Sequence, residues 1–243
     1  MKVISSLRGL SRVGLLSSAA RTQSARVTPI VRMLSMSPKS LNVVPELKDA
    51  LSREIVAEKE LSQHNLGGNV TPAFKGFQVT QKEAEVRLTK THGNEQILVV
   101  FNVNHSVDVS EDFEDIESAD AAPVPIALPP FSIEITKGDQ RLCFHMELVE
   151  SADSEQPGEY DYRVEEFYIA PAVKSGNEDV PAEVYASSGR YIDTQLHDLL
   201  FLRYLEERGF DAEFCKTLVQ FATHYEHEQY VNLLAKIQNF ISK

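Results

Sequence analysis

Residues Tyr191–Lys243 read YIDTQLHDLLFLRYLEERGFDAEFCKTLVQFATHYEHEQYVNLLAKIQNFISK and decide the fold, because they predict two consecutive helices. Asp193 is a good N-cap for a first helix over 193–208, and Gly209 can adopt the left-handed conformation that ends a helix. Apolar side chains recur at helical spacing along this first helix, at Leu196, Leu199, Leu200, Tyr204 and Leu205.

A second and longer helix is predicted over 211–241, with Asp211 as its N-cap. Its apolar side chains are spaced by four and three residues, with one shift of five after Tyr225, and form one narrow stripe: Phe214, Leu218, Phe221, Tyr225, Tyr230, Leu234, Ile237 and Ile241. A long, narrow stripe is typical of a helix that packs along another element. We therefore expect this helix to have a partner.

Two segments of this region carry a resemblance to a known family: LLFLRYLEERGFDAEF (199–214) and HYEHEQYVNLLAKIQNFI (224–241). Three more segments extend it towards the N-terminus: EIVAEKEL (54–61), VVFNVNHSV (99–107) and PPFSIEI (129–135). Together they resemble the mitochondrial acidic matrix protein family. The resemblance implies an α+β fold, in which a strongly twisted seven-stranded antiparallel sheet is flanked by one N-terminal and two C-terminal helices. It also implies a doughnut-shaped homotrimer.

A helix near the front of the chain is predicted over 46–62. It is too short to bury its apolar side alone, so its natural partner is the long C-terminal helix, as in the family that the chain resembles. We expect the seam between these helices, or between copies of the chain, to use Leu47, Leu51, Ile55, Leu218, Phe221, Tyr225, Leu234 and Ile237.

The middle of the chain, about 72–188, alternates apolar and polar residues in short runs separated by turns. Alternation of this kind predicts strands with one solvated face, and the short turns make neighbouring strands antiparallel. About seven strands are expected, from 74–80 at the front to 182–186 at the end. The alternation changes phase at Glu165 and Glu166, which predicts a β-bulge.

The first 45 residues contain seven Lys and Arg, many Ser and no acidic residue. This composition is typical of a mitochondrial transit peptide, and we expect residues 1–34 to be one, followed by a single domain over 35–243. The alternative is a basic tail without a targeting role. No run is long and apolar enough to cross a membrane, so the expected location is the mitochondrial matrix, without membrane insertion.

Charge is concentrated after the predicted transit peptide. All 36 acidic residues but only 17 of the 24 basic residues lie from Glu46 onward, so this part carries about 19 net negative charges. A field of this size attracts basic partners and repels polyanions, although solubility alone is the simpler explanation. Two loops are densely acidic, 108–120 and 150–161, and they could be docking surfaces or solubilising linkers. The candidate contacts are Glu111, Asp112, Glu114, Asp115 and Glu117.

Motifs for enzymatic chemistry are missing from the sequence. The 11 glycines form no phosphate-binding pattern, and there is no GxSxG. The cluster of His224, Glu226, His227 and Glu228 lacks HExxH spacing, and the acidic loops lack the spacing of an EF-hand. Cys143 and Cys215 belong to no CxxC pair, and a matrix location predicts free thiols. We expect no metal, no cofactor and no catalytic residue.

The resemblance and the charge together predict a non-enzymatic, chaperone-like binding protein. It would hold basic proteins, such as ribosomal proteins, and support mitochondrial translation, ribosome assembly and oxidative phosphorylation. The alternative is direct binding to mitochondrial mRNA or rRNA, which needs clustered cations. RNA association is expected to be indirect, unless folding gathers Lys75, Lys82, Arg87 and Lys90 on one face.

Overall fold

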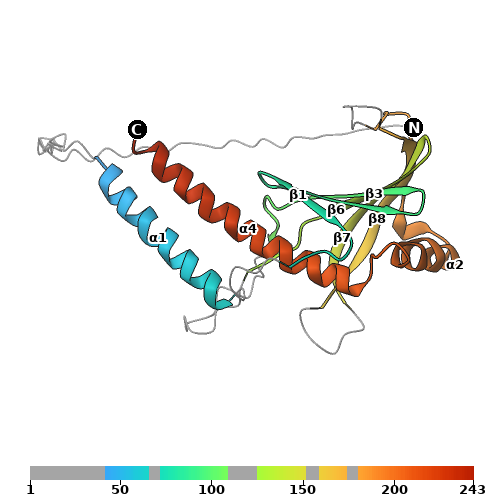
Figure 1. Cartoon of the computed structure of the whole chain (residues 1–243), viewed down its shortest axis with the longest axis horizontal. Helices are drawn as coiled ribbons and strands as arrows, with labels where there is room; N and C mark the ends of the chain where they lie inside the picture. The colour runs from blue at the N-terminus through green and yellow to red at the C-terminus, as the bar shows by residue number, and fades with distance from the viewer. Residues whose placement is uncertain (1–41, 66–71, 109–124, 152–158, 174–179) are drawn as a thin grey trace, which may run out of the picture. The chain divides into compact units, whose positions relative to one another are not determined.

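The structure is a computed structural model that describes residues 42–65, 72–108, 125–151, 159–173 and 180–243. The described residues belong to one compact unit that begins at Asn42. One helix precedes the strands, and the remaining helices follow them (Figure 1). The predicted transit peptide, 1–34, lies outside the described residues.

The main sheet has seven strands in the order β1-β2-β3-β6-β7-β8-β9, and every neighbouring pair is antiparallel. The strands are β1 Gln78–Lys82, β2 Glu85–His92, β3 Glu95–Asn102, β6 Phe131–Lys137, β7 Gln140–Glu150, β8 Tyr160–Pro171 and β9 Ala186–Ser188. A separate short pair joins β4 Val107–Asp108 to β5 Ile126–Ala127. The predicted seven-stranded antiparallel sheet is therefore confirmed.

Both ends of the sheet differ from the predicted strands. The first strand begins at Gln78 rather than Phe74, because Gly76 has a φ of +79° and turns the chain there, and the Phe77 N–H donates to the Phe74 carbonyl at 3.2 Å. The last strand begins at Ala186 rather than Ala182, because a turn closed by the Val184 N–H and the Pro181 carbonyl precedes it.

The predicted bulge is present between β7 and β8. His145 pairs with Glu166, but the next residue of β7, Met146, pairs with Val164, so Glu165 is the extra residue on β8. An extra residue of this kind bends its strand and increases the local twist. This is the phase change that the sequence shows at Glu165 and Glu166.

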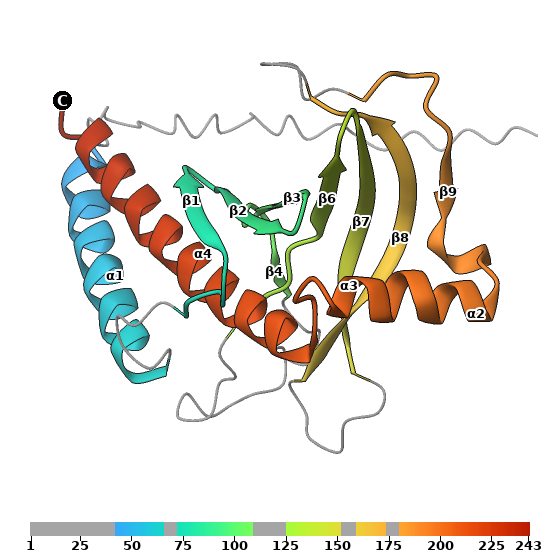
Figure 2. The same ribbon diagram turned by 45° about the vertical axis from the view of Figure 1, so that its right-hand side comes forward.

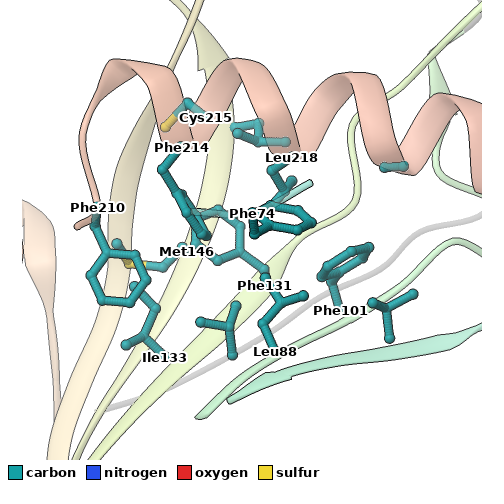
Figure 3. Packing of buried hydrophobic residues seen from close by; sticks show 14 of the residues in the cluster. Phe74, Leu88, Phe101, Phe131, Ile133, Met146, Phe210, Phe214, Cys215 and Leu218 are labelled. Atoms are coloured by element: carbon teal, nitrogen blue, oxygen red, sulfur yellow. The ribbon is translucent and has the colours of Figure 1, made fainter. Parts of the chain in front are cut away.

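The hydrophobic core lies between one face of the sheet and the C-terminal helices. Figure 3 shows side chains from β2, β3, β6 and β7 packed beneath a helix that contributes Phe214, Cys215 and Leu218. Phe74 packs against this helix, with its ring centroid 5.6 Å from that of Phe214. Buried apolar side chains alternate with exposed residues along the strands, which explains why the sheet has one solvated face.

The first C-terminal helix is not one regular α-helix. It consists of α2 Thr194–His197, a π-helical segment η4 Asp198–Arg203 and α3 Tyr204–Glu206. The predicted N-cap is correct, because the Asp193 carboxylate accepts hydrogen bonds from the Gln195 and Leu196 N–H groups. The predicted end is also observed, since Gly209 has a φ of +93°.

The π-helical turn makes part of the predicted apolar side of this helix wrong. Leu196 and Leu199 were expected to face inward, but their side chains are 48% and 47% exposed. The other predicted members lie in or against the core, where Phe201 joins them: Leu200, Tyr204 and Leu205. A π turn inserts one residue relative to an α-helix, so side chains on either side of it no longer share the face that regular spacing predicts.

The long helix α4, Ala212–Phe240, runs beside the N-terminal helix α1, Val44–Asn65 (Figures 1 and 2). Asp211 caps α4 as predicted, accepting from the Phe214 N–H at 2.9 Å. The two helices are antiparallel, because Gln238 near the end of α4 reaches Ser52 while His227 in its middle reaches Glu58. The expected pairing of the N-terminal helix with the long C-terminal helix is thus present.

Candidate partner-binding surfaces

The acidic segment that carries the predicted contacts Glu111, Asp112, Glu114, Asp115 and Glu117 lies outside the described residues. Its base is described and is firmly anchored. β4 and β5 pair at either end of the segment, and the Ala127 N–H donates to Thr223 Oγ1 of α4 at 3.0 Å. The segment therefore begins and ends beside the middle of α4.

The predicted seam residues fall into two groups. Leu218, Phe221 and Tyr225 are buried against the sheet in the hydrophobic core. Leu51 and Leu234 are also buried, on α1 and on the second half of α4. The remaining three are less covered, since Ile55 is half-buried and Leu47 and Ile237 are exposed.

Polar contacts fix the register of α1 on α4. The Gln238 amide donates to the Ser52 hydroxyl at 2.7 Å. The His227 ring lies against Glu58, with Nε2 3.1 Å from its carbonyl oxygen and Nδ1 3.5 Å from its carboxylate. The neighbouring Glu226 has its pKa raised, chiefly by burial, while His227 opposes the shift. This histidine thus belongs to a helix contact, and Glu228 is exposed.

No group of three or more His, Cys, Asp and Glu side chains suited to a metal ion is present in the part of the chain that the structure describes. His145 and Cys143 lie on the same face of β7, but the imidazole of His145 is directed to the Tyr168 hydroxyl, with Nε2 3.2 Å from it. Cys143 and Cys215 are free, buried thiols. Burial is the main cause that raises the pKa of Cys143 to about 11 and that of Cys215 to about 12.

A buried ion pair that the sequence did not reveal joins the end of α3 to β3. The Arg208 guanidinium donates to both carboxylate oxygens of Glu95, from Nε at 2.8 Å and from Nη2 at 3.1 Å. It also lies 3.4 Å from the centroid of the Tyr204 ring. Hydrogen bonding to Arg208 is the largest cause that lowers the pKa of Glu95. This pair positions the turn between α3 and α4 over the sheet.

The solvated face of the sheet carries a chain of exposed ion pairs around the bulge. Arg163 Nη2 lies 2.8 Å from Glu147, and its Nε contacts Glu165, which also pairs with Arg190 at 2.8 Å. These carboxylates are already matched by arginine, so they are poor candidates for binding further cations.

The four cations that folding could have gathered do not form one patch. Arg87 and Lys90 are three residues apart on β2, so their side chains leave opposite faces of the sheet. Lys90 is moreover committed to the core side, because its Nζ donates to the Arg208 carbonyl at 2.9 Å and lies 4.9 Å from the centroid of the Phe77 ring. Arg87 bonds to Glu85 at 2.7 Å.

Among the described helices, none is both long enough and apolar enough to span a membrane.

Comparison with known proteins agrees with this architecture. A family model described as mitochondrial glycoprotein, MAM33, matches residues 51–241. Conserved regulator of innate immunity protein 3 of Caenorhabditis elegans is 65% identical over 243 residues, which cover 100% of both chains. The human complement component 1 Q subcomponent-binding protein, mitochondrial, is 25% identical over 205 residues, covering 79% of this chain and 70% of its own. Mitochondrial acidic protein mam33 of Schizosaccharomyces pombe is 26% identical, with 81% and 78% covered.

Solved structures support the fold alone. The Trypanosoma brucei p22 protein superposes with a TM-score of 0.55 at 17% identity, covering 82% of this chain and 98% of its own. A Leishmania major protein, described as a sequence homologue of human p32, gives a TM-score of 0.54 at 18% identity with the same coverage.

The names of the sequence relatives place the chain among mitochondrial proteins, as expected, and a matrix location agrees with them. The family model matches most of the chain, so the chain belongs to the mitochondrial glycoprotein family MAM33.

Proposed function

We propose that this protein is a non-enzymatic, chaperone-like binding protein that holds basic proteins in the mitochondrial matrix. Its charge carries the proposal, because residues from Glu46 onward contain 36 acidic and 17 basic residues. Such an excess steers cationic partners to the surface and keeps them soluble once bound. By holding basic ribosomal proteins before assembly, the protein would support mitochondrial translation, ribosome assembly and oxidative phosphorylation.

Two further parts of the proposal concern the form of the protein. Residues 1–34 would act as a cleaved transit peptide, since they contain arginine and serine but no acidic residue. The mature chain, 35–243, would assemble as a homotrimer. Apolar side chains left exposed along α1 and the second half of α4 support self-association: Leu47, Val56, Leu233, Ile237 and Phe240.

The acidic segment with Glu111, Asp112, Glu114, Asp115 and Glu117 is the proposed docking site for basic partners. A trimer would present three copies of it, and multivalent binding strengthens the hold on a partner with several basic segments. Direct RNA binding is the weaker alternative, since Arg87 and Lys90 lie on opposite faces of the sheet.

The test is light scattering with mass determination of residues 35–243, mixed with a basic mitochondrial ribosomal protein or with ribosomal RNA across a salt series. We expect a trimer that binds the basic protein at low salt, releases it at high salt because exposed charges are screened, and leaves RNA unbound. A complex with bare RNA that salt dissociates would replace this function with the RNA-binding alternative.

A further inference from the structure

A groove of about 290 Å³ lies between the start of β8 and the corner where α3 gives way to α4. Seven residues line it, and six of them decide its chemistry: Asp161, Tyr162, Leu202, Glu206, Phe210 and Asp211. Pockets for small molecules usually occupy roughly 300–1,000 Å³. A groove at the lower limit of that range suits one or two side chains of a partner rather than a whole small molecule.

The floor of the groove is apolar and rigid. Phe210 is fully buried and packs against Phe77 and Phe214. The Tyr162 hydroxyl donates to the Phe201 carbonyl at 2.6 Å, so its ring is fixed and its one polar group is satisfied. Leu202 is 45% exposed although it is a large apolar side chain on a well-formed helical segment. Leu202 thus offers apolar surface, beside the half-buried Tyr162 ring, that this chain leaves uncovered.

The rim of the groove is negative, with three carboxylates: Asp161, Glu206 and Asp211. Among the residues that the structure describes, no lysine, arginine or histidine nitrogen lies within 4.0 Å of the carboxylates of Asp161, Glu206 or Asp211. Asp161 accepts from the Ser151 hydroxyl, and Asp211 accepts from the Phe214 N–H. Both bonds are to neutral donors, so no cationic side chain within the described ranges compensates these charges.

The basic residues nearest to the groove in the sequence are committed to other partners: Arg163 to Glu147 and Glu165, Arg203 to Asp198, and Arg208 to Glu95 and the Tyr204 carbonyl. The carboxylates of the rim also act on the Tyr162 hydroxyl. Burial is the first cause that raises the pKa of Tyr162, and the negative charges of Glu206, Asp161 and Asp211 add to it.

We propose that this groove, which we call the Tyr162 groove, binds a basic amphipathic segment of a partner protein. An apolar side chain of the segment packs on Leu202 and on the half-buried ring of Tyr162. Lysine or arginine side chains beside it face the carboxylates of Asp161, Glu206 and Asp211. The inference rests on the proposed function. It assigns a defined binding surface to basic partners, which the net charge alone does not locate. The same carboxylates repel a nucleic-acid backbone.

The test measures binding of a fluorescent synthetic helical peptide, with leucine on one face and lysine on the other, to the full chain by fluorescence anisotropy. Two variants address the two halves of the groove. Asp161→Asn with Glu206→Gln removes two rim charges while keeping side-chain shape, and Leu202→Gln removes the exposed part of the floor. Asp211 is left unchanged because it caps α4. Glu207→Gln with Glu228→Gln is the matched control, since it removes the same charge from exposed positions outside the groove.

We expect each groove variant to weaken peptide binding about tenfold, while the control pair stays near wild type. Circular dichroism and thermal unfolding verify that all variants are folded. Equal weakening of peptide binding by the control pair would overturn the inference that the Tyr162 groove is the binding site. The proposed function would stay intact, since the overall negative charge of the protein would then attract the peptide. No binding to the wild-type chain would overturn both. A Leu202→Gln variant of altered oligomeric mass would also overturn the inference, because a second copy would then occupy the groove.

Discussion

Arg208 and Glu95 form a buried, two-pronged ion pair, with only 8% and 5% of their side chains exposed, although they stand 113 residues apart in the sequence. The pair fastens the corner before α4 to β3, the third strand of the sheet. A cation next to it, Lys137, approaches the same carboxylate at 3.5 Å from the solvent side. This corner forms one side of the Tyr162 groove, so the pair links the core to the proposed binding surface.

Removing Glu95 is expected to destabilise the protein strongly. The Glu95→Ala variant leaves the Arg208 guanidinium buried without its partner, and an uncompensated buried charge costs about 3–5 kcal/mol. Urea unfolding followed by circular dichroism measures the change. Lys236→Ala is the control, because it breaks an exposed pair with Glu83 and should cost less than about 1 kcal/mol. A similar loss of unfolding free energy in the two variants would contradict the prediction that the buried pair stabilises the fold more than an exposed pair does.

The same pair predicts a pH dependence of stability. Arg208 holds the pKa of Glu95 below its ordinary value of 4.5 in the folded protein. The folded state therefore binds this proton less readily than the unfolded chain does, so the stabilisation is fully present above that ordinary value. It is lost as the pH falls through the lowered pKa of the folded state. The free energy of unfolding of the wild type should fall more steeply with acidification than that of Glu95→Gln. Parallel curves of unfolding free energy against pH for the two proteins would contradict this prediction.

The sequence predicts those parts of the fold that have a local signal. Alternation along β6 and β7 predicts strands with one buried face, and the caps Asp193 and Asp211 predict where two helices begin. The π turn of η4 leaves no such signal, because the leucines around it fit α-helical spacing equally well. Leu196 and Leu199 were for this reason placed on the wrong side.

The contacts that build the candidate surfaces are mostly long-range, and no periodicity encodes them. Nothing in the sequence around Glu95 distinguishes it from the exposed glutamates nearby, and its burial follows only from the position of Arg208. The Tyr162 groove likewise joins a strand to a helix corner some 40 residues later in the chain. The charge excess, by contrast, could be read directly from composition.

Gly189 is expected to tolerate no side chain. A Cβ atom there would lie 2.1 Å from the Val164 carbonyl oxygen, because the short helix η3, Gly189–Tyr191, passes against β8 beside the bulge. Since backbone atoms on both sides would have to move, Gly189→Ala should lower the free energy of unfolding by about 3 kcal/mol.

Gly93→Ala is the matched control for this clash. Its Cβ would meet nothing within 4 Å, and only its φ of +58° is unfavourable, which costs about 1 kcal/mol. Denaturant unfolding of both variants gives the comparison. A Gly189→Ala variant no less stable than Gly93→Ala would mean that η3 can move away from β8 at little cost.

Leu51 and Leu234 are expected to hold α1 in place independently of the sheet. Both are buried, while their neighbours Leu47 and Ile237 are exposed, so the α1 contact depends on few apolar side chains. Leu51→Ala should therefore release α1 locally, at a cost of about 2 kcal/mol or more, while the core that α4 shares with the sheet persists. Hydrogen exchange measures this directly: amides of α1 should exchange faster, and those of β6 and β7 should keep their protection. Lys59→Ala, at an exposed position of α1 outside the apolar set, is the control and should change neither. If Leu51→Ala instead accelerated exchange throughout the sheet, α1 would be part of one cooperative unit with the core, and self-association through this helix would have to be coupled to folding of the whole domain.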